Sequence, residues 1–273
     1  MIWICVLTIL KNIIGEFMQK ENVLKMDDWN AYKIPHTVEI EDESEPTKTL
    51  VIEFEKKRKV LSTREGLKTV NFVGNHSIPV PFWDKVHNYK DYEKQVLEKI
   101  GIEKKDIALL STGANMDNLA IAKEEFDEFY TVSLTTAGAK FNAIRLGDEE
   151  ADYIQKDFKT YKIVDGKLIP KEEVGTVNII LITNANLTDG ALAKAIITIT
   201  EAKTNVFQEL DIRSTKHPEL QATGTGTDSI IVVGGFGKKV DYTGGHTKIG
   251  EMIAKCVKKS VKEALIKQDE LEI

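Results

Sequence analysis

The segment TEAKT, residues 200–204, places a carboxylate and an ammonium group within one apolar stretch of a predicted helix. Glu201 and Lys203 lie on helix turns flanked by apolar residues, which is not the charge pattern of a solvated helix face. One of the two side chains is therefore expected to point into a cleft. A carboxylate buried there would have a raised pKa and could serve as a general acid or base. A surface charge pair explains the same spacing at least as well.

A loop rich in glycine and threonine, ATGTGTDSIIVVGG at residues 222–235, leads into an apolar strand. Its backbone N–H groups, the hydroxyls of Thr225 and Thr227 and the carboxylate of Asp228 form a convergent polar set, as in phosphate-binding loops. However, the G-x-x-x-x-G-K-[ST] and dinucleotide patterns are missing, and a strand follows where a phosphate loop requires a helix. A nucleotide site is therefore not expected.

The segment TTAGAKFNAIRLGD, residues 135–148, follows another apolar strand and has small residues where the backbone must turn. This composition is typical of a pocket rim, because glycine lets a ligand come close to the backbone. Asn142 offers an amide donor and acceptor, and Arg145 with Asp148 could hold the loop or bind a polar group. A strand-to-helix turn in which Asp148 caps the next helix is the structural alternative.

Two further segments place polar residues at the ends of predicted elements. In GTVNIILITNANL, residues 175–187, a Gly-Thr pair precedes an apolar strand that ends at Asn184 and Asn186. Polar residues at a strand end often line a site, although threonine and asparagine are also ordinary strand and turn residues. In YTGGHTKIGE, His246 stands at the start of the last predicted helix, where the positive helix terminus favours the neutral, proton-accepting imidazole. A helix-cap role explains His246 equally well.

The pattern of expected strands and helices around these residues predicts an α+β fold, in which mixed strands are flanked by helices. Residues 37–61 are typical of two strands joined by an acidic turn at residues 43–46. Apolar runs predict buried strands at residues 107–112, 130–136, 177–184 and 229–235, and helical spacing predicts helices at residues 91–101, 116–126, 187–210 and 246–268. The lysine-rich stretch 157–175 is either an internal junction or a surface excursion.

Composition narrows the class of protein. Hydrophobic residues make up 42% of the 273 residues, which suffices for a globular core. The net charge of -6 argues against nucleic-acid binding, which requires clustered lysine and arginine. The two cysteines, Cys5 and Cys256, have no cysteine or histidine at metal-ligand spacing, and no H-E-x-x-H motif occurs. We therefore expect no metal site and a reduced, cytoplasmic protein.

The amino terminus is apolar over MIWICVLTIL and again over NIIGEFM. Ten apolar residues are fewer than the roughly 20 that a spanning helix requires, and neither a positive segment nor a small-residue cleavage site flanks them. Three explanations stay open: a true start at Met18 or Met26, an apolar element that packs on the domain, or a membrane anchor. We expect residues 1–35 to be an extension and residues 36–273 to be one domain, without stable membrane insertion.

Taken together and in this order, the segments resemble the adenosylcobinamide amidohydrolase family of corrinoid salvage. The similarity covers about residues 60–265. It runs through VLSTREGLKTVNFVGNHSIPV, IALLSTGANM, TTAGAKFNAIRLGD, the block that ends in TEAKT, ATGTGTDSIIVVGG and GGHTKIGEMI. The ordered set is specific, whereas any one glycine-rich piece would be weak.

This resemblance implies hydrolysis of adenosylcobinamide to adenosylcobyric acid and 1-amino-2-propanol, a salvage step of cobalamin (vitamin B12) biosynthesis. Cobalt and the adenosyl group belong to the substrate, so we expect no cofactor of the protein itself, a corrinoid small molecule as partner, and no nucleic acid. A homo-oligomer is compatible with the sequence. The residues expected to bind the amide-rich substrate are Asn142, Arg145, Asp148, Asn178, Lys203, Thr225 and Thr227.

Two mechanisms are compatible with the residues. In the first, Glu201, Asp228 or His246 acts as a base toward water. The tetrahedral oxyanion is then stabilised by Asn142, by Lys203 or by loop N–H groups.

In the second mechanism Thr176 attacks the amide. Gly175-Thr176 before an apolar strand is similar to the processing point of the self-cleaving aminopeptidase and ornithine acetyltransferase group. In that group the residue after the cleaved bond becomes a new amino terminus, whose α-amine can act as base for its own hydroxyl. This more distant resemblance also implies a layered αββα arrangement.

Two other functions stay open. A non-catalytic corrinoid-binding or carrier protein could use the same polar pocket, although the D-x-H-x-x-G loop of familiar cobalamin-binding modules is missing from the sequence. A nucleotide-dependent kinase or transferase of the same pathway would require ATP.

Overall fold

The computed structural model describes residues 19–83, 85–86, 91–151, 153–156, 159–164, 167–170 and 176–272. Its centre is a nine-stranded mixed sheet in which β1-β2-β3-β15-β12-β7-β6 are neighbours in that order, while β4 pairs with β3 and β5. The strands are β1 (Glu21–Lys25), β2 (Trp29–Ile40), β3 (Glu43–Ser62), β4 (Gly66–Ser77), β5 (Ile107–Thr112), β6 (Ala120–Phe126), β7 (Phe129–Ala137), β12 (Val177–Thr183) and β15 (Ser229–Val233).

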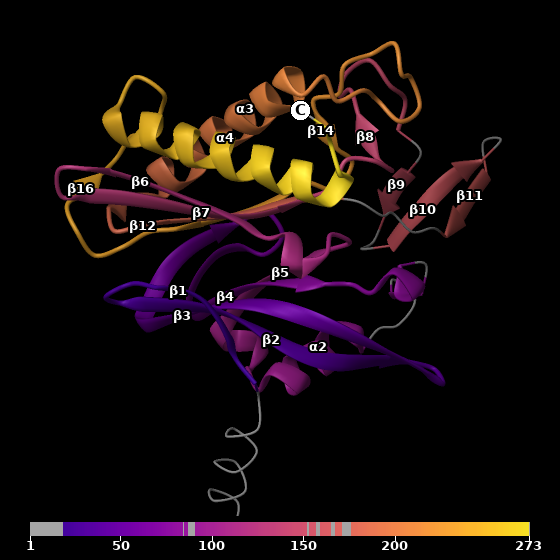
Figure 1. Cartoon of the computed structure of the whole chain (residues 1–273), viewed down its shortest axis with the longest axis horizontal. Helices are drawn as coiled ribbons and strands as arrows, with labels where there is room; N and C mark the ends of the chain where they lie inside the picture. Colours follow the sequence, from indigo (N-terminus) through magenta and orange to yellow (C-terminus); the bar gives the residue numbers. More distant parts are fainter. Residues whose placement is uncertain are drawn as a thin grey trace, which may run out of the picture.

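The sheet curls so that its two halves face each other, because the 20-residue strand β3 belongs to both halves. Most of β3 pairs with β2 and β4, and its last residues pair with β15. A break in the β3–β4 register between Glu53 and Arg58 is the kind of irregularity that bends a strand. Figure 1 shows the resulting layers, with β6, β7 and β12 above β1–β5.

Successive side chains of each strand point to opposite faces of the sheet, so apolar residues pack both between the two halves and against the helices on the outer faces. Ile179 and Leu181 of β12 pack toward α3 (Asp189–Glu209) and α4 (Lys248–Asp269), whereas Ile180 and Ile182 pack between the two halves. On the far side, α2 (Tyr92–Ile100) packs on β2 to β5. The order of layers is therefore helix, sheet, sheet, helix, which confirms the α+β prediction and agrees with the αββα arrangement (Figure 1).

The two long helices begin at Asp189 and Lys248, each two residues after the predicted start. Thr188 caps α3 by accepting from the N–H of Ala191 at 3.2 Å, and Thr247 caps α4 by accepting from the N–H of Gly250 at 3.1 Å. A threonine hydroxyl at this position satisfies one of the N–H groups that a helix start leaves without an internal partner. Both helices lie on the same outer face of the sheet.

Two predicted elements are wrong. Residues 116–126, predicted as a helix, form the short helix η4 (Met116–Asn118) and strand β6, whose alternating residues pair with β7. The turn between β2 and β3 falls at residues 41–42, where Glu41 has a φ of 55°, because residues 43–46 pair with β2. Tertiary pairing overrides the local pattern in both places.

The domain begins before residue 36. Strand β1 and most of β2 lie in the part of the chain expected to be an extension, and Trp29, Ala31 and Ile34 of β2 are buried in the core. Residues 1–18, which carry the apolar run, lie outside the described residues. Within the described ranges, no helix is long and apolar enough to cross a membrane.

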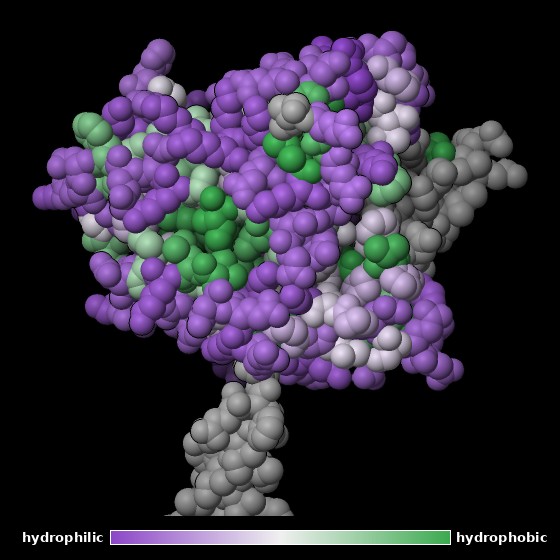
Figure 2. Space-filling view, viewed as in Figure 1, coloured by the Kyte–Doolittle hydropathy of each residue, from purple (hydrophilic) through white to green (hydrophobic). Residues whose placement is uncertain are grey.

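Shorter elements complete the described chain. A separate three-stranded antiparallel sheet consists of β9 (Tyr153–Lys156), which precedes the lysine-rich stretch, and of β10 (Lys159–Val164) and β11 (Lys167–Pro170) within it. The others are η1 (Val80–Phe82), η3 (Lys104–Asp106), β8 (Ala143–Ile144) paired with β14 (Gly224–Thr225), and β13 (Asn186–Leu187) paired with β16 (Lys239–Val240). On the face shown in Figure 2, apolar side chains gather between the two halves of the sheet.

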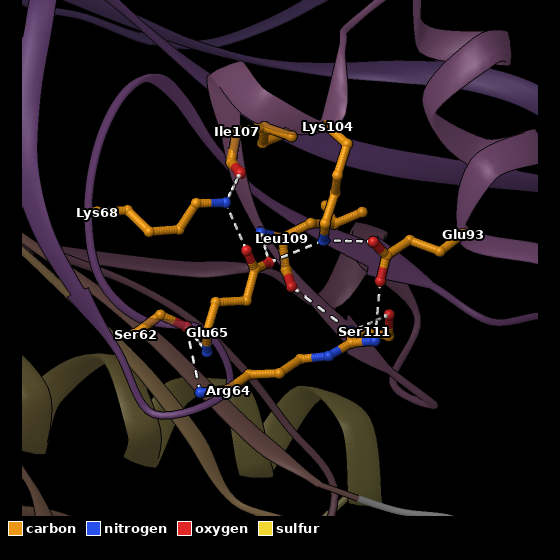
Figure 3. Close-up of polar contacts among 9 residues, drawn as sticks. All are labelled: Ser62, Arg64, Glu65, Lys68, Glu93, Lys104, Ile107, Leu109 and Ser111. Carbon is orange, nitrogen blue, oxygen red and sulfur yellow. Dashed lines mark hydrogen bonds and ion pairs between the residues drawn. The ribbon is translucent and has the colours of Figure 1, made fainter. Parts of the chain in front are cut away.

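A charged cluster ties the β3–β4 turn to β5 and α2 (Figure 3). The carboxylate of Glu65 accepts from Lys68 at 2.5 Å, from Lys104 at 3.1 Å and from the N–H of Leu109 at 3.1 Å. Arg64 and Lys104 also pair with Glu93 of α2. Burial raises the pKa of Glu65, but the hydrogen bonds from Lys68, Leu109 and Lys104 outweigh it and hold the pKa below its ordinary value.

Glu65→Gln is expected to lower the free energy of unfolding by about 1–3 kcal/mol near pH 7, because the variant loses hydrogen bonds that involve a charged group. The folded-state pKa of Glu65 lies below the unfolded-state value. Its contribution is therefore present above the unfolded pKa and is lost as the pH falls through the folded pKa. Urea unfolding near pH 7 and near pH 3 measures this.

The difference in unfolding free energy between wild type and Glu65→Gln should shrink in acid. Glu98→Gln, at an exposed carboxylate of α2, is the matched control and should change stability by no more than about 0.5 kcal/mol at either pH. A Glu65→Gln difference of equal size at both pH values would contradict the account.

Candidate functional site

Three strands meet at the edge of the sheet where the candidate residues lie. Strands β12 and β15 are parallel and start together, and β7 runs antiparallel to β12 and ends there. Thr176 directly precedes β12, Asp228 directly precedes β15, and Gly138 directly follows β7. The N–H of Gly138 donates to the carbonyl oxygen of Thr176 at 3.2 Å. The topology thus brings together segments that are far apart in the sequence.

The carboxylate of Asp228 connects the start of β12 to the loop before β15 through hydrogen bonds. It accepts from the N–H of Val177 at 3.1 Å, from the N–H of Thr225 at 3.2 and 3.3 Å to its two oxygens, and from the Thr225 hydroxyl. The ammonium group of Lys203 forms an ion pair with the same carboxylate. Both oxygens of Asp228 are therefore engaged in hydrogen bonds, so this residue holds the loop and the strand together.

Lys203 reaches Asp228 from α3 and is only 6% exposed. Gly224 makes room for it, because a Cβ at this position would collide with the ammonium group and with Asp228. Glu201 is exposed instead. Two residues on a helix are separated by about 200°, so the two side chains point to opposite sides. The expected inward-pointing residue is Lys203, and a buried carboxylate at Glu201 is wrong.

Thr176 is 5% exposed, and its hydroxyl donates to the carbonyl oxygen of Thr227 at 2.7 Å and to Oδ1 of Asn178 at 3.2 Å. The amide nitrogen of Asn178 in turn donates to Oδ1 of Asn75 and to the carbonyl oxygen of Ser111, both at 2.8 Å. These bonds fix the orientation of the Asn178 amide. The hydroxyl of Thr176 is thus held at the end of a buried polar chain between the two halves of the sheet.

Asn75 was missed by the sequence analysis, although its pattern carries a signal. Along β4, Val73 is buried in the core between the two halves, and Asn75 occupies the next position on the same face. A polar residue at such a core position requires hydrogen-bond partners. Its Nδ2 donates to the hydroxyl of Thr136 at 2.9 Å.

The segment 138–148 divides into a part beside the cluster and a part directed away from it. The carbonyl oxygen of Asn142 accepts from the N–H of Gly226 at 3.3 Å, so Asn142 lies against the threonine loop. Arg145 pairs with the exposed Asp148 at 2.6 Å and donates to the carbonyl oxygen of Gln221 at 3.0 Å, which holds the loop. Asp148 does not cap a helix, because the next described element is strand β9.

His246 lies far from the cluster. It is exposed and precedes the cap Thr247 of α4. Asp269, at the other end of this 22-residue helix, accepts from the N–H of Ala139 at 2.8 Å, next to Gly138. A helix of that length spans about 33 Å. The structure therefore does not bring His246, considered as a base toward water, to the cluster that contains Thr176 and Asp228.

A cleft borders the cluster and has two hollows, of about 680 Å³ and about 200 Å³. Trp83, Gly113 and Gln268 line both hollows, so the two adjoin. Gly138 lines the smaller hollow and also bonds to Thr176. Thr176 thus lies one hydrogen bond behind the wall of the cleft, and the predicted pocket rim at residues 135–148 is confirmed for Gly138.

The end of α4 forms one wall of this cleft, which the sequence analysis missed because KQDELEI reads as a charged tail. Oε1 of Gln268 accepts from the N–H of Asn115 and from Nδ2 of Asn118, both at 2.9 Å. Burial raises the pKa of Asp269, although its hydrogen bond from Ala139 opposes the shift. These contacts fix the wall to the loops that follow β5 and β7.

The site therefore holds a buried hydroxyl, several oriented amides and a charge pair behind the wall of the cleft that Gly138 lines. Such groups suit the recognition and cleavage of an amide-rich small molecule. In the part of the chain that the structure describes, no group of three or more histidine, cysteine, aspartate or glutamate residues could hold a metal ion.

Lys203→Met is expected to lower the free energy of unfolding by about 1–3 kcal/mol, because it removes the cation from the partly buried Asp228 carboxylate. The double variant with Asp228→Asn should recover part of this loss. Urea unfolding measures both. Glu201→Gln, two residues earlier on the same helix, is the control and should change stability by no more than about 0.5 kcal/mol. A loss of stability in Lys203→Met as small as that of the control would contradict a stabilising role of the Lys203–Asp228 ion pair.

Comparison with known proteins places this site in a family. A family model described as adenosylcobinamide amidohydrolase matches residues 31–273. An uncharacterized protein of Methanocaldococcus jannaschii is 83% identical over 253 residues, which cover 93% of this chain and 99% of that protein. An adenosylcobinamide amidohydrolase of Methanosarcina mazei is 25% identical over 227 residues, which cover 80% of this chain and 94% of that protein.

Among solved structures, a protein from Pyrococcus horikoshii is similar with a TM-score of 0.41 at 12% identity, over 94% of this chain and 90% of that one. The family match extends from within β2 to the end of the chain and includes every candidate residue of the site. The chain belongs to the adenosylcobinamide amidohydrolase family.

Proposed function

We propose that this protein hydrolyses the amide between the aminopropanol arm and the corrin ring of adenosylcobinamide. The products are adenosylcobyric acid and 1-amino-2-propanol, and the reaction serves the salvage of cobamides in the cytoplasm. The family match over residues 31–273 carries the proposal. Cys256, a buried free thiol in the described chain, is consistent with a reducing compartment.

The geometry of the site supports a large amide-bearing substrate. The cleft has two adjoining hollows of about 680 and 200 Å³, which offer room for part of a large ligand. The polar chain from Asn75 through Asn178 to Thr176 lies directly behind it. Oriented amides and hydroxyls of this kind bind amide groups without requiring a charge on the ligand. Cobalt and the adenosyl group come with the substrate, so no cofactor of the protein enters the reaction.

The contacts favour Thr176 over water as the attacking group. Among the bases considered for water, Glu201 is exposed on the outer side of α3, and His246 lies at the far end of α4. Asp228 already accepts hydrogen bonds at both oxygens, including those from Lys203 and the N–H of Val177. Thr176 is the group that the surrounding bonds hold in a single orientation next to the cleft wall.

In the proposed reaction the Thr176 oxygen bonds to the amide carbon and loses its proton to a base. The resulting oxyanion takes hydrogen bonds from the amide of Asn142 or from N–H groups of the threonine loop. The C–N bond then breaks, the base returns the proton to the leaving amine, and 1-amino-2-propanol departs. Water hydrolyses the remaining ester, which gives the carboxylic acid and restores the hydroxyl.

The freed α-amine of Thr176 is the base in this proposal. In the intact chain the Thr176 hydroxyl donates to a carbonyl oxygen and to an amide oxygen, neither of which takes up a proton near neutral pH. Hydrolysis of the bond after Gly175, a residue outside the described ranges, would consume one water and leave an amine on Thr176. Such an amine has a pKa of about 8, which suits a general base.

A non-catalytic corrinoid carrier is the alternative function. It would use the same cleft, and it differs in that a bound corrinoid leaves unchanged. A nucleotide-dependent reaction is less consistent with the threonine loop, because the loop enters strand β15 rather than the start of a helix.

Incubation of adenosylcobinamide with the protein, without nucleotide, should yield adenosylcobyric acid by chromatography. Thr176→Ala is expected to lower kcat by about a thousandfold or more, whereas Thr176→Ser keeps a hydroxyl and should retain a substantial part of the activity. Thr200→Ala is the matched control, because the exposed Thr200 hydroxyl donates within α3 to the carbonyl oxygen of Ile196 at 2.8 Å. Tight binding without product would favour the carrier, and full activity in Thr176→Ala would remove Thr176 from the mechanism.

A further inference from the structure

The mouth of the cleft exposes large apolar side chains. Phe141 is 64% exposed and Val80 is 66% exposed, while Trp83 beside them is half-buried. Single exposed apolar residues are common on protein surfaces, but apolar residues that line a concave site usually contact a ligand. All three residues line the cleft.

The two aromatic rings come from segments that are distant in the sequence. Trp83 follows η1, after strand β4, and Phe141 lies in the loop between β7 and β8. Their ring centroids are 6.5 Å apart and the rings are inclined by 65°. The indole nitrogen of Trp83 donates to the carbonyl oxygen of Ile78 at 2.9 Å, and the adjacent Phe82 is fully buried. The indole is therefore held in place before any ligand arrives.

Beside the rings, the cleft is lined by glycines and by charged residues: Glu45, Lys48 and Asp117 in the larger hollow, and Lys140, Asp269 and Glu270 in the smaller one. Gly113 and Gly138 line the cleft without side chains, so a planar ligand could come close to their backbone. A Cβ at Gly138 would lie 3.1 Å from Cγ of Gln268. Asn115 and Gln268 add amide groups at the edge. This combination fits a broad ring system with an apolar face and amide groups around its rim.

We propose that the exposed ring of Phe141, supported edge-on by Trp83, forms a platform for the apolar face of the corrin ring and thereby places the aminopropanol arm beside Thr176. The inference rests on the proposed function, because that function identifies the corrin ring as the ligand. The link to Thr176 is short: Gly138 bonds to the Thr176 carbonyl at 3.2 Å, and Phe141 lies three residues further along the same loop. A ring seated on the platform has its rim at this loop.

Phe141→Ala tests the platform, because an exposed side chain can be truncated without loss of the core. The KM for adenosylcobinamide should rise about tenfold or more, as for the loss of a well-placed aromatic contact, while kcat changes little. Trp83→Phe should have a smaller effect on KM. Phe236→Ala is the matched control, since Phe236 is 60% exposed and does not line the cleft; its KM should equal that of the wild type.

Equilibrium dialysis with adenosylcobyric acid separates this proposal from the proposed function, because that compound has the ring but no aminopropanol arm. Phe141→Ala should weaken its binding about as much as it raises KM. Unchanged KM and unchanged binding in Phe141→Ala, in an enzyme that hydrolyses adenosylcobinamide, would overturn the platform alone. Phe141-dependent binding in a protein that never hydrolyses the substrate would overturn the proposed function and leave the platform standing.

Discussion

The ion pair between Asp228 and Lys203 is the interaction on which the candidate site depends. It joins three parts of the chain, because Asp228 also holds the N–H groups of Val177 and Thr225. A buried carboxylate requires a cation and several donors, and each of these comes from a different element. Without the pair, the loop before β15 and the first residue of β12 would lose their common anchor, and Thr176 would lose its defined position.

The curled sheet makes this meeting of segments geometrically possible. Parallel pairing of β12 and β15 places their first residues at one edge, and antiparallel β7 brings Gly138 to the same edge. Between the two halves the core is apolar along most of its length and becomes polar at Asn75, Thr136 and Asn178. The hydrogen bonds of these three residues show why polar groups are tolerated there: each amide has partners on neighbouring strands.

Much of the fold could be predicted from periodicity. The apolar runs of β12 and β15 and the three- and four-residue spacing of α3 and α4 lie where the structure has them. Residues 116–126 misled the prediction, because alanines and leucine at helical spacing also satisfy a strand once β7 lies beside them. The bounds of the amino-terminal strands were likewise missed, since β2 joins the sheet by pairing with β3, and β1 joins it by pairing with β2.

The candidate site was predicted in its components and less well in its arrangement. Thr176, Lys203, Thr225 and Asp228 do lie together, because short polar segments at strand ends converge when strands pair. Spacing along the chain does not show that His246 precedes one end of α4, a helix about 33 Å long, while the other end lies beside Ala139. The contact between Trp83 and Phe141 could not be predicted either, because it depends on two loops that only the folded chain brings together.

The account makes Thr176 both the attacking group and, through its own freed amine, the base. The most direct test of this claim is the intact mass of the denatured, catalytically active protein. The account predicts two fragments, with Thr176 as the first residue of the second. A single species of 30.6 kDa in a fully active preparation would contradict it.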